Sequence, residues 1–282
     1  MGMDMKVGLL NLGCSKNQVD GEYILGFLSE RGFEAVDDLR GADIILVNTC
    51  TFIQEATQEA IDTILEVARF KQEGVCRYLG VCGCFSQRYR EQVAVRFPEV
   101  DFWFGVHSWR EEMSEAFGLA GRPVETGRRK PAGHTAYLKI SSGCSRRCSF
   151  CVIPAIRGDF VSRPIDDILT EAHALRESGV EECILVSQDT SMYGSDIGSS
   201  LATLVERLLH DTSFPWLRTM YLHPSRIDDA FLDLMASEKR VCSYVDMPLQ
   251  HIADALLKRM GRTPRSAAVY RLLERIRTRV PD

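Results

Sequence analysis

Apolar and polar positions along residues 1–120 alternate between a strand-like and a helix-like period. Asp43–Asn48 holds a continuous apolar run, which is typical of a strand buried in a parallel sheet. Ala56–Phe70 instead places its apolar residues on one face, which is typical of an amphipathic helix. The same patterns predict strands at Lys6–Leu12, Cys76–Cys82 and Val100–Phe104, and helices at Val19–Arg31, Gln87–Phe97 and Trp109–Phe117. We therefore expect an N-terminal α/β domain, residues 1–120, with a doubly wound parallel sheet.

The same alternation returns in residues 135–282. It predicts strands at Tyr137–Ser141, Cys183–Ser187, Leu217–Leu222 and Tyr244–Met247, and helices at Ile165–Glu177, Leu201–Leu209, Ala230–Ala236, Ala253–Arg259 and Ala267–Arg279. Four β/α units in one direction predict a partial β/α barrel. The sequence stops at Asp282 just after a helix, so we expect this barrel to be C-terminally incomplete.

Residues 121–134 are expected to link the two domains. The stretch Gly118–Gly133 is rich in glycine and proline and has no apolar periodicity. Its basic run, Arg128-Arg129-Lys130, fits a solvated linker better than a substrate-contacting patch.

Composition narrows the class of protein. Apolar residues make up 45% and charged residues 26% of the 282 positions, as in ordinary soluble domains. No run approaches the roughly 18 apolar residues of a membrane span, and the N-terminus lacks a signal-peptide pattern, so we expect a cytoplasmic protein without a membrane partner. A net charge of −5 weakens the case for a stand-alone nucleic-acid binder. Ten cysteines in such a chain indicate metal or redox chemistry.

Three cysteines with the spacing Cys144-x-x-x-Cys148-x-x-Cys151 follow the first predicted strand of the second domain. Three thiolates on one loop can hold a four-iron cluster and leave one iron open for a cofactor. Gly143 permits a tight turn before them, and Phe150 offers an apolar cover. A zinc site in a nucleic-acid-binding protein is the alternative, but zinc usually takes four ligands, and no second cysteine pair lies within about 20 residues.

This spacing, with the aromatic Phe150 before the third thiol, resembles the radical S-adenosylmethionine superfamily. The flanking residues, Ser142-Gly143-Cys144, Ile153–Gly158 and Ser162-Arg163-Pro164, are similar to its methylthiotransferase branch. Members of that branch carry three further cysteines in the N-terminal domain, and Cys14, Cys50 and Cys84 each follow a predicted strand here. They would meet at the carboxyl edge of one parallel sheet. Cys82 competes with Cys84 for this role, whereas Cys76, Cys183 and Cys242 fit buried packing positions better.

Two further segments indicate which substrate class within the family this chain resembles. Ser187-Gln188-Asp189-Thr190 and Pro248-Leu249-Gln250-His251 are similar to the members that modify a small-subunit ribosomal protein. Relatives that modify tRNA usually carry Gln-Asn and Gln-Ser at these places, which leaves a tRNA adenosine as the alternative substrate. Members of the family continue with two more barrel strands and a small β-barrel called TRAM, neither of which is in this sequence. The resemblance therefore leaves open whether this chain alone catalyses the reaction.

The resemblance implies two [4Fe-4S] clusters, one on Cys14, Cys50 and Cys84 and one on the catalytic Cys144, Cys148 and Cys151. It implies S-adenosyl-L-methionine as cofactor, an electron donor, and transfer of a methylthio group to the β-carbon of an aspartate. We predict cofactor contacts at Phe150, Arg157, Gln188 and Asp189. A loop-capping Asp189 and a purely structural Arg157 are the alternatives. The arginines from Arg259 to Arg279 fit a solvated helix face better than a contact with ribosomal RNA.

Overall fold

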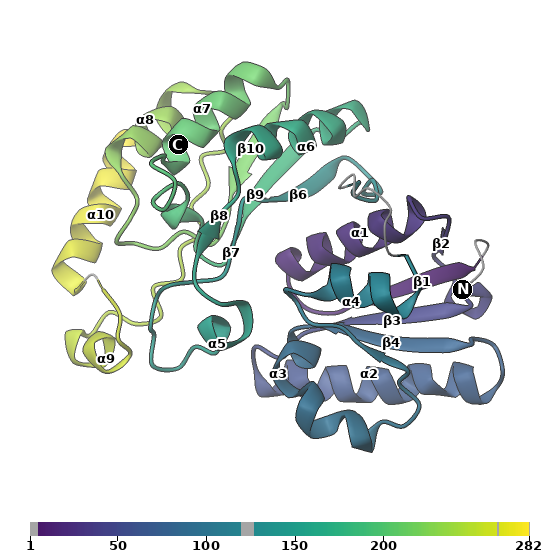
Figure 1. Cartoon of the computed structure of the whole chain (residues 1–282). Coiled ribbons are helices and arrows are strands. Elements are labelled where there is room, and N and C mark those ends of the chain that lie inside the picture. The colour runs from purple at the N-terminus through teal and green to yellow at the C-terminus, as the bar shows by residue number, and fades with distance from the viewer. Residues whose placement is uncertain (1–4, 120–126, 264, 282) are drawn as a thin grey trace. The chain divides into compact units, whose positions relative to one another are not determined.

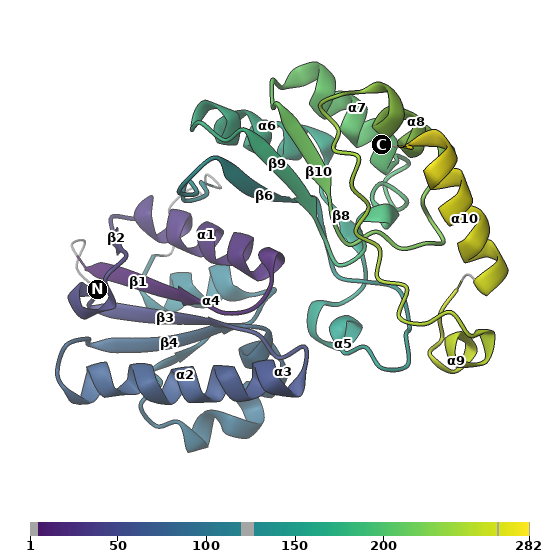
Figure 2. The same ribbon diagram turned by 180° about the vertical axis from the view of Figure 1, so that it is seen from behind.

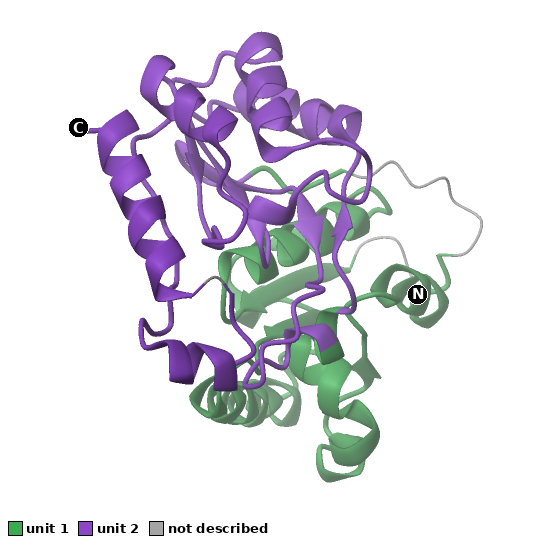
Figure 3. Cartoon of the chain, turned by 90° about the vertical axis from the view of Figure 1, so that its left-hand side faces the viewer, with its two compact units in different colours: residues 1–130, 155–157 green, residues 131–154, 158–282 purple. Residues whose placement is uncertain are grey.

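Residues 5–119, 127–263 and 265–281 are described in a computed structural model of the chain. The chain forms two compact units (Figure 3). The first comprises Met1–Lys130 with Ala155–Arg157, and the second comprises Pro131–Pro154 with Gly158–Asp282. Residues 121–126 of the expected linker lie outside the described residues.

A five-stranded parallel sheet in the order β2-β1-β3-β4-β5 forms the centre of the first unit. Every side chain of β3 is buried, as its apolar run predicts. The strands are β1 (Lys6–Asn11), β2 (Glu34–Val36), β3 (Ile44–Thr49), β4 (Tyr78–Gly83) and β5 (Phe102–Trp103). The short edge strand β2 has no apolar run and was not predicted.

Helices cover both faces of this sheet (Figure 1). On one face, α1 (Ser15–Ser29) and α4 (Trp109–Ala116) share an apolar cluster with the strands. On the other face, α2 (Gln54–Gln72) and α3 (Cys84–Val93) form a second cluster. The predicted doubly wound sheet is therefore confirmed. The short 3-10 turns Leu39–Gly41 and Ala94–Arg96 complete the unit.

The second unit is built on a three-stranded parallel sheet in the order β10-β9-β6. Its strands are β6 (Thr135–Lys139), β9 (Glu182–Val186) and β10 (Trp216–Thr219). A small antiparallel pair, β7 (Ser141–Ser142) with β8 (Val161–Ser162), closes the loop that carries the clustered cysteines. This pair was not predicted because each strand has only two residues.

Helices pack along this sheet around one apolar core (Figure 2). Serine and aspartate side chains cap two of them, since Ser200 accepts from the Thr203 N–H and Asp228 accepts from the Phe231 N–H. The helices that contribute to this core are α6 (Ile165–Glu177), α7 (Leu201–Asp211), α8 (Asp229–Ser237) and α10 (Ser266–Arg279), with a 3-10 turn at Thr190–Met192. The short helices α5 (Ile153–Arg157) and α9 (Asp254–Arg259) contribute no residue to it, and α5 ends in residues of the first unit. The mixed α/β class is confirmed for this unit too.

One predicted strand, Tyr244–Met247, is wrong, and another ends early. The segment after α8 forms no strand beside β10. It is joined to β10 and the residues after it only by an isolated bridge between Leu217 and Val241 and by a few irregular hydrogen bonds. The Asp246 carboxylate accepts from the Tyr221 N–H at 3.0 Å, so a side chain takes the place of a ladder bond. Tyr221 also has a φ of 62°, which ends the extended backbone of β10 before Leu222.

Among the described residues, no helix is both long and apolar enough to cross a membrane.

The packing of α2 can be tested with two neighbouring residues. Ile64 is fully buried, whereas Leu65 is 49% exposed. We expect Ile64→Ala to lower the free energy of unfolding by about 2–5 kcal/mol, because it leaves a cavity in the core. Leu65→Ala serves as the matched control and should change it by about 0.5 kcal/mol or less. Urea denaturation measures both, and equal effects would contradict the packing described.

Candidate functional site

Three cysteines of the first unit follow three neighbouring parallel strands. Cys14 comes after β1 and directly before α1, Cys50 directly follows β3, and Cys84 begins α3 after β4. The strand order places β1 between β2 and β3, so successive connections leave β1 and β3 in opposite directions. Such a switch point at the carboxyl edge is where open α/β sheets bind ligands.

The structure brings this first trio together. The charges of Cys14 and Cys50 both act on the Cys84 thiol. Gly13 has a φ of 91°, and a Cβ atom there would lie 2.6 Å from the Cβ of Cys50. Only glycine therefore lets the Cys14 loop approach Cys50 this closely.

A buried amide network holds these loops. The Asn17 side chain donates to the carbonyls of Leu12, Asn48 and Thr49 at 2.8–3.2 Å. The Asn48 side chain donates to the Asn17 carbonyl and the Asn11 side chain, both at 2.6 Å. The sequence analysis assigned no role to Asn17 or Asn48. A polar Asn48 at the end of an apolar strand was the available signal.

Arg157 belongs to the first unit, where it joins the same group of residues. Its guanidinium pairs with Asp20 and donates to the Asn17 side chain at 3.0 Å and to the Cys84 sulfur at 3.3 Å. Burial raises the pKa of the Cys84 thiol, and the charge and hydrogen bond of Arg157 offset part of that rise. These contacts place Arg157, a predicted cofactor contact, with the first trio.

The second trio lies on a single loop of the second unit. Cys144, Cys148 and Cys151 stand between β7 and α5. The Cys144 N–H donates to the Gly158 carbonyl and the Cys151 N–H to the Cys148 carbonyl, both at 3.1 Å. Burial raises the pKa of both Cys144 and Cys151. The charge of Cys151 further raises the pKa of Cys144, and the charge of Cys148 further raises that of Cys151. The three thiols are therefore close enough for their charges to interact.

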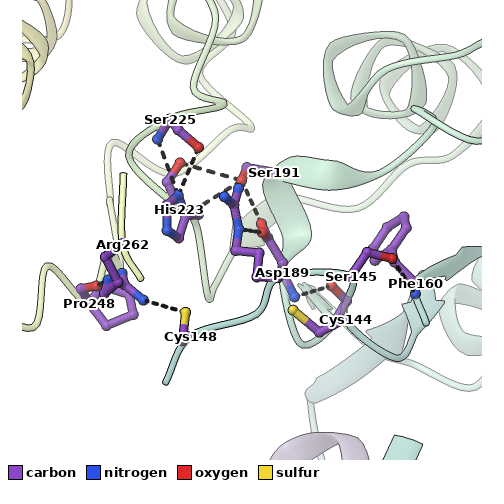
Figure 4. Close-up of polar contacts among 12 residues, drawn as sticks. Cys144, Ser145, Cys148, Phe160, Asp189, Ser191, His223, Ser225, Pro248 and Arg262 are labelled. Atoms are coloured by element: carbon purple, nitrogen blue, oxygen red, sulfur yellow. Dashed lines mark hydrogen bonds and ion pairs between the residues drawn. The ribbon is translucent and has the colours of Figure 1, made fainter. Parts of the chain in front are cut away.

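The turn after α9 packs on this loop. Both the N–H and the hydroxyl of Ser149 donate at 2.9 Å, to the carbonyls of Met260 and Arg259. The Arg262 guanidinium donates to the Cys148 sulfur at 3.8 Å and to the Pro248 carbonyl at 2.7 Å (Figure 4). Sequence reasoning counted Arg262 only among the basic residues of the C-terminal part and missed this contact.

The other C-terminal arginines with described partners are paired on the helix surface. Arg275 pairs with Asp229, and Arg279 pairs with both Asp229 and Asp233. These partners lie on α8, so the pairs tie α10 to its neighbouring helix.

Asp189 is the centre of a polar group beside the second trio (Figure 4). It is 3% exposed, forms an ion pair with Arg146, and accepts from the Ser191 hydroxyl at 2.6 Å. The Gln188 side-chain oxygen is buried without a hydrogen-bond partner among the described residues. Phe150 is 48% exposed. The cofactor contacts of Phe150, Gln188 and Asp189 stay predictions.

His223, which sequence reasoning did not single out, completes this polar group. Its N–H donates to the Ser191 hydroxyl oxygen at 3.1 Å, and the side chain is almost fully buried. Burial, followed by the charges of Arg146 and Arg262, lowers the pKa of His223 to about 3. The imidazole is therefore neutral at physiological pH. Its position after a strand, in Leu222-His223-Pro224, was the available signal.

The loops after β9 and β10 also enclose a pocket of about 340 Å³. Its lining includes Ser191 and Ser225, both of which bind His223, together with Tyr193, Arg226 and Phe231.

The donor set of each trio suits an iron–sulfur cluster better than a single ion. Within residues 5–119, 127–263 and 265–281, no three His, Cys, Asp or Glu side chains are arranged to share one metal ion. One zinc ion needs its sulfurs about 2.3 Å from a common centre. In a four-iron cluster each thiolate binds a different iron, so the sulfurs stand further apart. A trio of thiols that held such a cluster would leave one of its irons open.

Comparison with known families divides the chain into the same two parts. Residues 6–105 match the uncharacterized protein family UPF0004, and residues 138–282 match the radical SAM superfamily.

Curated relatives match nearly the whole chain. The ribosomal protein uS12 methylthiotransferase RimO of Desulfosudis oleivorans is 41% identical over 99% of this chain, and that of Geotalea uraniireducens is 43% identical over 98%. The RimO of Lachnoclostridium phytofermentans is 40% identical over 99%. The chain spans about two thirds of the length of these relatives, between 65% and 67%.

A solved structure shares the fold. The radical S-adenosylmethionine methyltransferase TsrM from Kitasatospora setae, with tryptophan and an analogue of the cofactor bound, aligns with a TM-score of 0.67. The alignment covers 99% of this chain and 66% of TsrM at 17% identity, so it supports the fold alone.

The tight turn before Cys144 can be tested with two glycines of similar backbone conformation. Gly143 has a φ of 76°, and a Cβ there would lie 2.0 Å from the Asp159 carbonyl oxygen. Gly133 has a φ of 104° with nothing within 4 Å. Gly143→Ala should therefore lower the free energy of unfolding by about 1–3 kcal/mol more than Gly133→Ala. Urea denaturation of both variants checks this, and a Gly133→Ala that is equally destabilising would contradict it.

Proposed function

Because the chain belongs to the RimO family of radical S-adenosylmethionine methylthiotransferases, we propose that it adds a methylthio group to ribosomal protein uS12. The observation that carries the proposal is the presence of one trio of neighbouring thiols in each unit. One trio suits radical generation and the other suits supply of the sulfur.

Cys144, Cys148 and Cys151 would hold the radical-generating [4Fe-4S] cluster and leave one iron for S-adenosylmethionine. With an electron donor, this group supplies a radical able to remove hydrogen from the unactivated β-carbon of an aspartate. Arg262 donates to the Cys148 sulfur and so stabilises that thiolate ligand. The buried Asp189 pairs with Arg146, which lies in the same loop between Cys144 and Cys148.

Cys14, Cys50 and Cys84 would hold a second [4Fe-4S] cluster, which would supply the sulfur for the transfer. Arg157 stabilises the Cys84 thiolate through its hydrogen bond, while Asp20 fixes the guanidinium. The amides of Asn17 and Asn48 keep the three loops in register.

A protein substrate is favoured over tRNA. The Gln188-Asp189 segment is similar to that of the protein-modifying members, and the relatives described above are named for uS12. A cytoplasmic location follows from a ribosomal substrate.

Deletion of the gene in its source strain tests the substrate. We expect uS12 from the deletion strain to lack the mass of one methylthio group at an aspartate, with tRNA modification unchanged. Mass spectrometry of both fractions measures this, and reintroduction of the gene controls for secondary mutations. Unchanged uS12 with altered tRNA would overturn the proposal.

Iron counting tests the two trios separately. After anaerobic reconstitution we expect about eight irons per chain, and about four when either trio is replaced by alanine. The matched control replaces Cys76, Cys183 and Cys242, which should leave the iron content unchanged. Stoichiometric zinc in place of iron, or a trio whose loss removes no iron, would contradict the proposal.

A further inference from the structure

Two buried side-chain nitrogen donors of the second unit lack hydrogen-bond partners among the described residues. They are the Arg146 Nη2 and the His223 Nε2 atoms. His223 is 6% exposed, and the Arg146 side chain is 19% exposed. A buried polar atom without a partner has lost its hydrogen bonds to water and gained none in return, so its presence calls for a ligand.

The hydrogen bonds of His223 determine which ring nitrogen carries its proton. The backbone N–H of Ser225 donates to Nδ1 at 3.3 Å, and the Ser225 hydroxyl lies 3.0 Å from the same atom (Figure 4). Nδ1 therefore accepts. Since the ring is neutral, its proton is on Nε2. The unpartnered atom of His223 is thus a donor, like that of Arg146.

One hydrogen-bond network joins the two residues that carry these donors. Arg146 pairs with Asp189, the Ser191 hydroxyl donates to Asp189, and the backbone N–H of His223 donates to the same hydroxyl oxygen. The charges that act on the imidazole are those of Arg146, which pairs with Asp189, and of Arg262. The surroundings therefore favour an anion.

We propose that Arg146 and His223 form a binding site for a ligand carboxylate, which accepts from Arg146 Nη2 and His223 Nε2. A planar carboxylate offers two oxygens to two donors and neutralises the excess positive charge. The inference rests on the proposed function, because its reactants bring two carboxylates: the methionyl group of the cofactor and the side chain of the target aspartate. A site that holds either one fixes the position of the reacting atoms.

The test compares four reconstituted proteins: the unaltered chain, His223→Phe, His223→Gln and His173→Phe. Phenylalanine removes the donor, whereas glutamine keeps an N–H donor. The control residue His173 is exposed on α6. Circular dichroism and iron content identify any variant that does not fold. Equilibrium dialysis measures the Kd of S-adenosylmethionine, of decarboxylated S-adenosylmethionine, of uS12 and of uS12 with asparagine at the target position.

If the cofactor carboxylate binds here, His223→Phe raises the Kd of S-adenosylmethionine by about tenfold or more and leaves the Kd of its decarboxylated form unchanged. If the substrate carboxylate binds here, His223→Phe raises the Kd of uS12 by a similar factor and leaves the Kd of the asparagine form unchanged. In either case His223→Gln restores part of the affinity, and His173→Phe has no effect.

Normal binding of both carboxylate ligands by a folded His223→Phe would overturn the inference and leave the proposed function intact. A failure of the unaltered chain to bind S-adenosylmethionine would overturn both. If His223→Phe does not fold, a folded Arg146→Gln takes its place, because glutamine lacks the charge of the guanidinium group. Unchanged affinities of this variant for both carboxylate ligands would equally overturn the inference.

Discussion

Parallel strands that pair in register deliver the residues after them to one edge of a sheet, and the first unit depends on this constraint. β1, β3 and β4 run in the same direction, so their carboxyl ends, at or beside Gly13, Thr49 and Gly83, lie at one edge of the sheet. Glycine at two of these places removes the Cβ atoms that would keep the loops apart. The thiols of Cys14, Cys50 and Cys84 are distant in sequence and are brought together by the pairing of the strands. The second unit reaches the same result by a different route, since one short loop closed by β7 and β8 carries all three cysteines.

Burial disfavours the thiolate form that a metal ligand needs, and nearby arginines stabilise that form. A metal ligand must be a thiolate, whereas burial raises the pKa of Cys50, Cys84, Cys144 and Cys151. Each trio has one arginine that donates to a sulfur, Arg157 in the first unit and Arg262 in the second. Both arginines are held by a further acceptor, Asp20 or the Pro248 carbonyl. The proposed clusters would therefore bind with release of protons and would lie among fixed positive charges.

Periodicity predicted the elements well and their polar contacts poorly. α6 has the predicted bounds, because its apolar face and the proline before it are local signals. The strand predicted at Tyr244–Met247 is absent, because a side chain of Asp246 takes a ladder position, which no local pattern reveals. The cysteines were found from spacing and from strand ends. Asn17, Asn48, Arg262 and His223 were assigned no role at the site, because each acts through a partner far away in the sequence, up to 114 residues for Arg262 and Cys148. The cofactor contact of Arg157 stays a prediction, and its bonds to Asp20, Asn17 and Cys84 could not be read from the sequence, because these partners lie 73 to 140 residues away.

The central claim is that two separate thiol trios, one in each unit, each hold an iron cluster. Anomalous diffraction at the iron edge, from crystals of the anaerobically reconstituted chain, tests it most directly. The account predicts two separate iron centres, one beside Cys14, Cys50 and Cys84 and the other beside Cys144, Cys148 and Cys151. Iron beside only one trio, or a signal at the zinc edge instead, would contradict it.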